Sequence, residues 1–215
     1  MNRTFRKRGF SLMELLVVLA VISILAVLIA PAIRGTLSSY QLDSTGQTVI
    51  NQLNLARQTA LSRGHAVQVR FYLLPAYNSS ISGTPVVYRG MQSFIESDPI
   101  QGGTSVSVTA TPITKPIFFP TPVIISSVTT PAPVSPLLPA TPADADVTNP
   151  LPLYNTNYKV ATFHFKSDGS TDLTSTTNSL SLVLQYEKAG PNGLPANFQT
   201  TSINPLNGAV RSFRP

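Results

Sequence analysis

One segment of this chain is apolar enough and long enough to leave water, and it lies near the N-terminus, over residues 9–33 (GFSLMELLVVLAVISILAVLIAPAI). From Leu15 to Ile33 the only plainly polar side chain is that of Ser23. As a helix with a rise of 1.5 Å per residue, this stretch would be about 28 Å long, close to the roughly 30 Å hydrocarbon core of a bilayer. The segment therefore predicts a single transmembrane helix.

The residues around this segment predict its orientation. Residues 2–8 carry four basic side chains and no acidic one, so the positive-inside rule keeps the N-terminus in the cytoplasm and exports the rest of the chain. A secretory signal peptide would have a shorter apolar core, followed by a cleavage site with small residues. Since neither feature is present, the sequence predicts that the helix is retained as a single-pass anchor.

Glu14 is the one acidic residue within this apolar segment. A carboxylate carried to the middle of a bilayer costs roughly 2.5–3.5 kcal/mol, so an ionisable residue in such a helix is a functional candidate whose partner must be found. Cleavage between Gly9 and Phe10 would create an α-amino group about one helical turn from Glu14. That amine would belong to the same chain or to a neighbouring one.

A short basic leader, then Gly9-Phe10-Ser11-Leu12-Met13-Glu14 and an unbroken apolar helix, resembles the signal of type IV pilins and type II secretion pseudopilins. The resemblance implies cleavage after Gly9 by a prepilin peptidase, N-methylation of Phe10 and a place in the inner membrane. It also implies that Glu14 pairs with the N-terminus of an adjacent subunit. Pro31 falls where many pilins have a proline that bends or locally melts the helix. The alternative is a plain signal anchor with a chance glutamate.

The composition limits what the exported part can be. The formal net charge is +6, but the leader holds four of the 15 basic residues, so eleven basic and nine acidic residues remain. This balance does not predict a general attraction to nucleic acid. The chain has no cysteine, which excludes disulfides and thiolate metal sites. Its 215 residues suffice for one modest domain beyond the anchor.

We expect four parts along the chain: a basic leader over 1–9, a transmembrane helix over 10–33, an amphipathic continuation of that helix over 34–64, and an exported β-rich domain over 65–215. In the continuation, four apolar residues recur at helical spacing and predict a face laid on a core: Val49, Leu53, Ala56 and Ala60. Gly46 would cost the helix about 1 kcal/mol relative to alanine, and Gly64 is a natural stop.

Several segments of the exported domain alternate with a period of two and predict strands: 65–71, 86–89, 160–165 and 180–186. A helix leading directly into a strand, a Phe-x-Phe strand before an Asp-Gly-Ser turn, and the closing segment 203–211 are similar to minor subunits of the GspH/FimT type. Ala209 departs from that family, since many members have arginine there. The resemblance implies an α+β fold, in which a long N-terminal helix packs on an antiparallel β-sheet.

An insertion over about 112–152 contains eleven prolines. Proline lacks the amide donor and fixes φ, so we expect no central strand or helix there. The apolar residues 117–119 and 123–125 could pack on the domain or form edge strands, so we expect the first part of the insertion to be held to it. We expect residues 129–152 to be an extended surface excursion.

The sequence offers no constellation for catalysis or for a cofactor, and we expect the protein not to be an enzyme. His65 and His164 each lie at a strand position without a second histidine or a carboxylate at helical spacing, so they predict structural or surface histidines rather than zinc ligands. Asp168 and Asp172 could suggest calcium, but so sparse a set is more typical of a hairpin turn, and no metal site is predicted.

The function that we expect is structural: a subunit of a hetero-oligomeric pilus or pseudopilus, with the membrane, the prepilin peptidase and other pilin subunits as partners. The alternative is a tip pilin that binds DNA. Arg211 and Arg214 are separated by two residues and could face one side of a strand and reach adjacent phosphates, with help from Arg70 or Lys188. We favour the more ordinary interpretation, an exposed edge strand guarded by charge.

Overall fold

The computed structural model describes residues 10–97, 100–102, 105–107, 109–126, 137–138, 141–173, 180–187, 195 and 197–214; the side chains of 28–35 and 100–107 lie outside that description. Contacts divide the chain into two compact units, Met1–Tyr40 and Gln41–Pro215. The boundary lies inside one continuous helix, α1 (Leu12–Arg63).

The part of α1 that belongs to the second unit buries the face that its sequence predicts. Val49, Leu53, Ala56 and Ala60 are all fully buried. The helix ends where predicted: Gly64 has a φ of 69°, and its N–H donates to the carbonyl of Ala60 at 2.9 Å. A residue without a Cβ reaches this left-handed conformation at little cost, which is why glycine so often ends helices.

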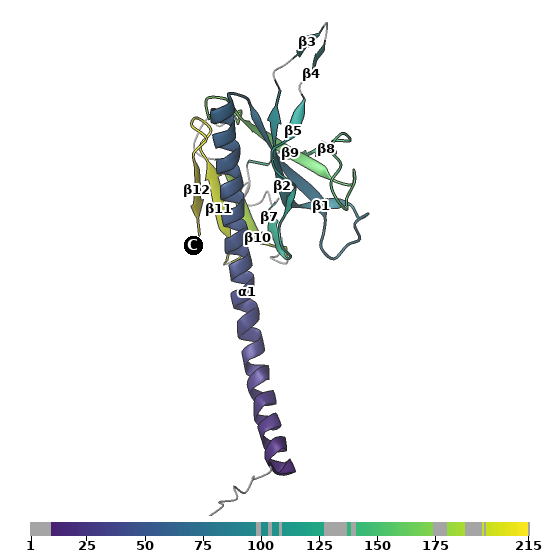
Figure 1. Ribbon diagram of the computed structural model, residues 1–215, viewed down its shortest axis with the longest axis vertical. Coiled ribbons are helices and arrows are strands. Elements are labelled where there is room, and N and C mark those ends of the chain that lie inside the picture. The colour runs from purple at the N-terminus through teal and green to yellow at the C-terminus, as the bar shows by residue number, and fades with distance from the viewer. Residues whose placement is uncertain are drawn as a thin grey trace, which may run out of the picture. The chain divides into compact units, whose positions relative to one another are not determined.

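The second unit is built on a 10-stranded antiparallel sheet (Figure 1). In spatial order its main path is β12 (Val210–Phe213), β11 (Gln199–Ile203), β10 (Leu180–Tyr186), β7 (Val123–Ile125), β2 (Pro85–Glu96), β1 (Val67–Pro75), β9 (Lys159–Phe165) and β8 (Ala143–Asp144). Two further short strands pair with β2: β5 (Ala110–Pro112) and β6 (Ile117–Phe118). The predicted α+β class, a long N-terminal helix and an antiparallel sheet, is confirmed.

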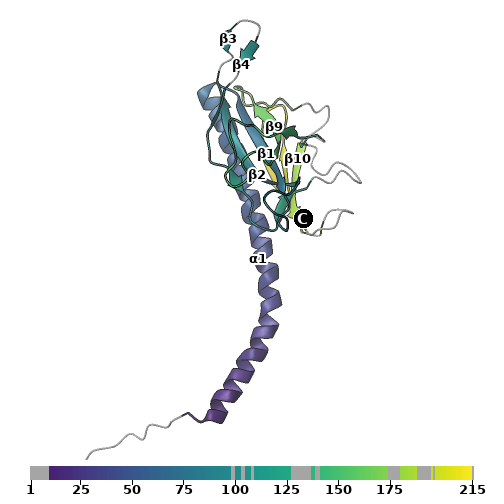
Figure 2. The same cartoon turned by 90° about the vertical axis from the view of Figure 1, so that its right-hand side faces the viewer.

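The main core lies between α1 and one face of this sheet, where Figure 2 shows α1 running alongside β1 and β2. On β1 the alternating residues Val67, Val69 and Phe71 are buried in this core. Their partners on β9 are Phe165, Phe163 and Ala161, respectively. The remaining strands, β3 (Ile100–Gly102) and β4 (Ser105–Ser107), form a separate two-stranded sheet.

The expectation that the proline-rich insertion supplies only edge strands is wrong for β7. This strand pairs with β10 on one side and with β2 on the other, so it lies in the interior of the sheet. The physical reason is local: Pro120 and Pro122 precede the strand, whereas Val123–Ile125 contains no proline and keeps its amide donors. All three of its residues are buried.

The expectation of an extended surface excursion over 129–152 is wrong at Leu151, which is buried, whereas residues 141–150 are exposed or half-buried. Leu151 and Tyr158 pack with Tyr72 and Leu74 in a second apolar cluster on the opposite face of β1. Tyr158 anchors the loop through its hydroxyl, which donates to the carbonyls of residues 146 and 149. Residues 129–136 and 139–140 of the predicted excursion lie outside the described residues.

Gly46 lies where α1 packs tightly against β11 of the sheet. A Cβ built on Gly46 would lie 1.8 Å from Oε1 and 2.2 Å from Cδ of Gln199, the first residue of β11. Because the side chain of Gln199 is itself buried, it has little room to move away. Gly46 lowers the helix propensity of this segment, but the packing of α1 against Gln199 favours a residue without a side chain there.

We expect Gly46→Ala to destabilise the protein by up to about 2 kcal/mol, because it adds an overpacking cost of about 1–3 kcal/mol and returns only roughly 1 kcal/mol in helix propensity. Urea unfolding of the full chain in detergent measures the difference. The double variant Gly46→Ala/Gln199→Ala removes the clash and should unfold at a higher urea concentration than Gly46→Ala alone. A single variant more stable than the wild type would contradict this packing.

Candidate functional site

The first turn of α1 is fixed by two side chains that bond each other's backbone. The N–H of Glu14 donates to Oγ of Ser11 at 3.2 Å, and the N–H of Ser11 donates to Oε2 of Glu14 at 3.5 Å. This is a capping box, which satisfies two amides that the start of a helix leaves unpaired. The pattern Ser-x-x-Glu was the signal in the sequence, and the prediction based on the charge of Glu14 missed it.

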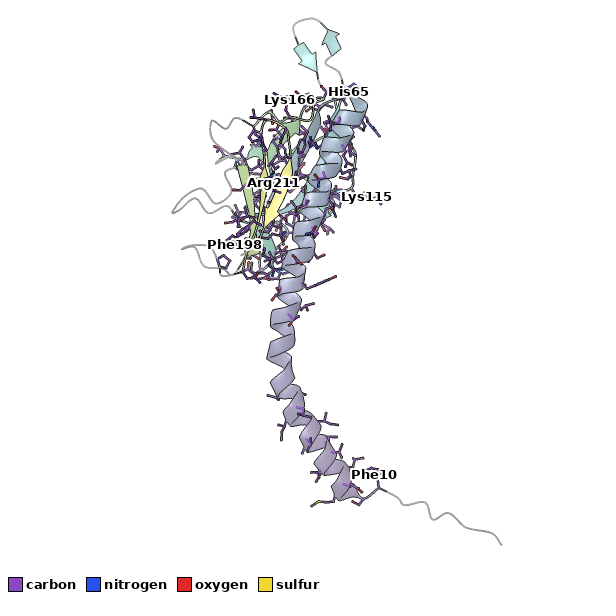
Figure 3. The ribbon with its side chains drawn as sticks, turned by 90° about the vertical axis from the view of Figure 1, so that its left-hand side faces the viewer. Phe10, His65, Lys115, Lys166, Phe198 and Arg211 are labelled. Carbon is purple, nitrogen blue, oxygen red and sulfur yellow. The ribbon has the colours of Figure 1, made fainter. Side chains whose placement is uncertain are left out.

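The helix that follows is apolar on all sides and exposed on all sides. From Phe10 to Val27, every large apolar side chain is between 49% and 82% exposed within this single chain. Figure 3 labels Phe10 at the start of this segment. A helix with no polar face is normally covered by lipid or by other apolar helices, so this segment presents a surface made for other molecules.

Over the residues whose side chains the structure describes, no helix combines the length and the apolarity that a membrane crossing requires. The transmembrane helix over 10–33 stays a prediction. Helix α1 is continuous through Pro31, and the bend predicted there also stays a prediction. Gly9, the residue before the predicted cleavage site, lies outside the described residues.

The two C-terminal arginines predicted to reach DNA have different surroundings. Arg211 is exposed on β12, the last strand on its side of the sheet, as Figure 3 shows. Arg214 follows the strand, lies 3.3 Å from Asp43 and donates to Asn197 at 3.0 Å. Because Arg214 lies beyond the end of β12, the alternation of a strand does not apply to it, and the expectation that the two arginines face one side stays a prediction.

Arg70, the third arginine considered for DNA, is buried. Its Nη1 lies 2.7 Å from Oδ2 of Asp146, and its guanidinium lies 3.9 Å from the ring centroid of Phe94. Burial raises the pKa of Asp146, but hydrogen bonds from Thr148, Asn149 and Arg70 outweigh it and hold that pKa well below its ordinary value. The pair ties the loop after β8 to β1 and leaves Arg70 unable to reach a phosphate. Lys188 lies outside the described residues.

His164 lies between two carboxylates that the sequence did not connect to it. Its Nδ1 is 2.6 Å from Oδ2 of Asp172, and its Nε2 is 3.1 Å from Oε1 of Glu96. The amide of Gln68 also lies 3.1 Å from Nε2. Three strands and a turn bring these groups together, so no local spacing could have revealed the cluster.

Asp168 and Asp172 were predicted to belong to a hairpin turn, and Asp168 does. Oδ1 of Asp168 accepts hydrogen bonds from the N–H and the hydroxyl of Ser170 at 2.9 and 2.6 Å, which is the geometry of a side-chain-capped turn. Asp172 instead accepts from His164. Among the described residues, no group of histidines and carboxylates is arranged to hold a metal ion.

Two turns that the sequence singled out meet at the last part of α1. Nε of Arg57 donates to the carbonyl of Asn207 at 2.9 Å and lies 3.3 Å from that of Gly169. A Cβ on Gly208, whose φ is 63°, would lie 2.2 Å from the carbonyl oxygen of Gly169. The closing turn and the Asp-Gly turn therefore pack against each other and against Arg57. The residues in these turns on which the family resemblance rests have a structural role here.

Comparison with known proteins gives one sequence match and one structural likeness. Residues 4–30 match the model of the prokaryotic N-terminal methylation motif. No curated protein matches the chain. Among solved structures, the minor pseudopilin EpsH from the Type 2 Secretion System of Vibrio cholerae aligns with 11% sequence identity and a TM-score of 0.42, over 81% of this chain and 98% of that chain.

The His164 cluster predicts a pH dependence of stability. The hydrogen bond to Asp172 raises the pKa of His164 above 6.5, although burial opposes it. A raised histidine pKa adds stability that is fully present below the unfolded value and is lost as pH rises through the folded value. We expect the Tm advantage of the wild type over His164→Asn to shrink between pH 6 and pH 9, by thermal unfolding.

Asp172 gives stability the opposite dependence on pH. Burial raises the pKa of Asp172, but His164 lowers it by more, so this contribution is lost only as the pH falls below the ordinary aspartate range. His65→Asn controls for the loss of a histidine elsewhere. Parallel profiles of Tm against pH for the wild type and His164→Asn would show that the cluster does not couple to folding.

Proposed function

We propose that this chain belongs to the type IV pilin and pseudopilin superfamily and is a minor structural subunit of a type II secretion pseudopilus or a type IV pilus. The observation that carries the proposal is the N-terminal segment. It matches the methylation motif over residues 4–30, and its helix starts with a capped glutamate and then exposes apolar side chains on every side.

The proposed life of the chain follows from that segment. Residues 1–9 are a leader that a prepilin peptidase removes, and Phe10 becomes the N-methylated first residue. Residues 10–33 hold the subunit in the inner membrane with its N-terminus on the cytoplasmic side. Residues 34–64 continue the helix, and 65–215 form the exported domain.

In the assembled filament, the apolar helices of neighbouring subunits cover one another. Burial of apolar surface supplies the cohesion, at roughly 25 cal/mol per Å². The carboxylate of Glu14 accepts a hydrogen bond from the new α-amino group of Phe10 on an adjacent subunit. A buried ion pair adds little net stability, but removing one of its partners leaves an unpaired buried charge and is strongly destabilising. The pair therefore sets the register of one subunit against the next.

The finer assignment to the GspH/FimT type rests on the helix-to-strand junction and on the closing turn. Its partners would be other pilin subunits in a hetero-oligomeric filament. Members of the superfamily are structural subunits, and we propose no enzymatic role. DNA capture remains the alternative, but among the described arginines considered for it, Arg70 is buried and Arg214 is ion-paired, so no observation favours it.

We expect the protein extracted from membranes to begin at N-methylated Phe10, and to begin at Met1 in cells that lack their prepilin peptidase. The intact mass and the N-terminal residue measure this directly. Gly9→Val should block cleavage in normal cells, because a bulky residue replaces the one before the cut. A chain that begins at Met1 in both strains would leave Glu14 without a created amine and would end the pilin proposal.

Glu14→Gln separates the charge from the helix cap. Glutamine at this position still completes a capping box, so we expect α1 to form as before. Incorporation into filaments, measured by co-purification with the other subunits, should fall about tenfold or more, because the amine of the neighbour is left buried and unpaired.

Ser11→Ala is the matched control for that substitution. It removes the cap, which costs about 1 kcal/mol, but keeps the carboxylate. Incorporation should therefore be nearly normal. If Ser11→Ala impairs assembly as much as Glu14→Gln does, Glu14 acts through the helix start and the proposed pairing is wrong.

A further inference from the structure

Arg89 is a buried cation that forms no ion pair with a described residue; the carboxylate of Glu187 accepts a hydrogen bond from the N–H of the neighbouring Tyr77 at 3.4 Å instead. Its side chain is 7% exposed, and its Nε–H has no hydrogen-bond acceptor among the described residues. Every acidic residue of the chain except Asp98 is described, and none of them forms an ion pair with Arg89. Since an unpaired charge inside a protein costs several kcal/mol, buried arginines normally face an anion.

Two tyrosines hold the guanidinium without neutralising it. The Cζ atom of Arg89 lies 4.1 Å from the ring centroid of Tyr77 and 5.5 Å from that of Tyr154, and Nη2 donates to the hydroxyl of Tyr154. Aromatic faces attract a cation. Burial raises the pKa of Tyr77 to about 12, so its hydroxyl stays neutral and is no counter-ion.

The backbone directs Arg89 to this position by a β-bulge. The pairing of β1 with β2 shifts between Tyr72, which faces Gly90, and Leu73, which faces Tyr88, so Arg89 is the extra residue. Bulges turn a side chain out of the regular alternation and are frequent beside functional sites. The bulge is held in place by the N–H of Phe119, which donates to the carbonyl of Arg89 at 2.8 Å.

Apolar side chains lie beside the caged arginine. The ring of Phe118, which is 36% exposed, lies 5.8 Å from that of Tyr154. Tyr154 belongs to a tight loop closed by mutual backbone bonds between Leu151 and Asn155. In that loop Leu153 has a φ of 71° and is 79% exposed.

A left-handed leucine costs about 1–2 kcal/mol, and the side chain of Leu153, which is exposed, offsets little of this cost by packing within the chain. A buried arginine, tyrosines and an exposed apolar residue are also the residue types that dominate binding at protein interfaces. Both observations point to a surface that is completed by another molecule.

We propose that Arg89, together with Tyr77, Phe118, Leu153 and Tyr154, forms a docking surface for a partner protein that places an aspartate or glutamate against the guanidinium. The planar guanidinium fits a carboxylate through two parallel hydrogen bonds. A single arginine matches a single negative charge, and the apolar and aromatic neighbours match side chains of a protein. The inference concerns the sheet domain and does not rest on how the N-terminus is processed.

The first test uses the unmodified full chain in detergent, labelled with ¹⁵N-arginine. The Nε–H resonance of Arg89, assigned by its loss in Arg89→Lys, is followed during titration with N-acetyl-aspartate methylamide and, as the uncharged control, N-acetyl-asparagine methylamide. We expect a saturable shift with the aspartate compound alone, and no such shift at the exposed Arg211. An equal response to the asparagine compound, or no saturable response, would overturn the proposal.

Inorganic phosphate provides the competing arm of the same titration. A larger shift at Arg89 with phosphate than with the aspartate compound would show that the surface binds a phosphorylated molecule instead, and the carboxylate assignment would be wrong. The titration itself uses the unmodified chain, and only the resonance assignment needs the conservative variant Arg89→Lys.

The second test locates the partner in cells. A photoreactive phenylalanine analogue replaces Leu153, and in a control it replaces Val147, which is 76% exposed and precedes the same loop. We expect an adduct from position 153 whose cross-linked peptide carries an aspartate or glutamate. Arg89→Met should lower its yield about tenfold or more, as for other interface anchors, whereas Arg211→Gln should not. An adduct that is equally abundant with Arg89→Met would overturn the role of the arginine.

Discussion

The packing of one face of α1 against one face of the sheet is the interaction on which the second unit depends. Val49, Leu53, Ala56 and Ala60 are fully buried there, opposite the apolar residues of β1 and β9. Alanine on two turns, and glycine at position 46, let the helix axis come close to the strands. A sheet of this size would otherwise expose a continuous apolar face, and its hairpins would be unstable in isolation.

The opposite face of the sheet is organised by polar groups that come from the loops. Asp146 reaches back from the insertion to neutralise Arg70, and Asp172 reaches back from a turn to His164. In both cases a loop supplies the charge that a strand residue lacks. Arg89 departs from this arrangement, because aromatic rings surround it where a carboxylate would be expected. Arg70 and His164 have carboxylate partners from loops of this chain, and Arg89 has none among the described residues, which is why its environment points to a partner molecule.

Local patterns predicted most of the elements, and long-range pairing accounts for what they missed. The helix face and the strands near 65–71, 160–165 and 180–186 follow from periodicity alone. β11 was not predicted, because its Gln-Thr-Thr-Ser-Ile sequence is polar, although alternate residues are buried. The interior place of β7 depends on which strands lie beside it, and the His164 cluster depends on register across three elements. Neither is encoded in any short window of the sequence.

The position of β1 between β2 and β9 has a consequence for the order in which the chain can fold. β1 and β2 follow one another in the chain and are joined by residues 76–84, whereas β9 begins at Lys159, after the whole proline-rich insertion. A chain made from its N-terminus therefore holds a β-hairpin with one unpaired edge until the late strand arrives. Unpaired edges recruit other chains, so this interval is the one in which the nascent subunit is most prone to aggregate.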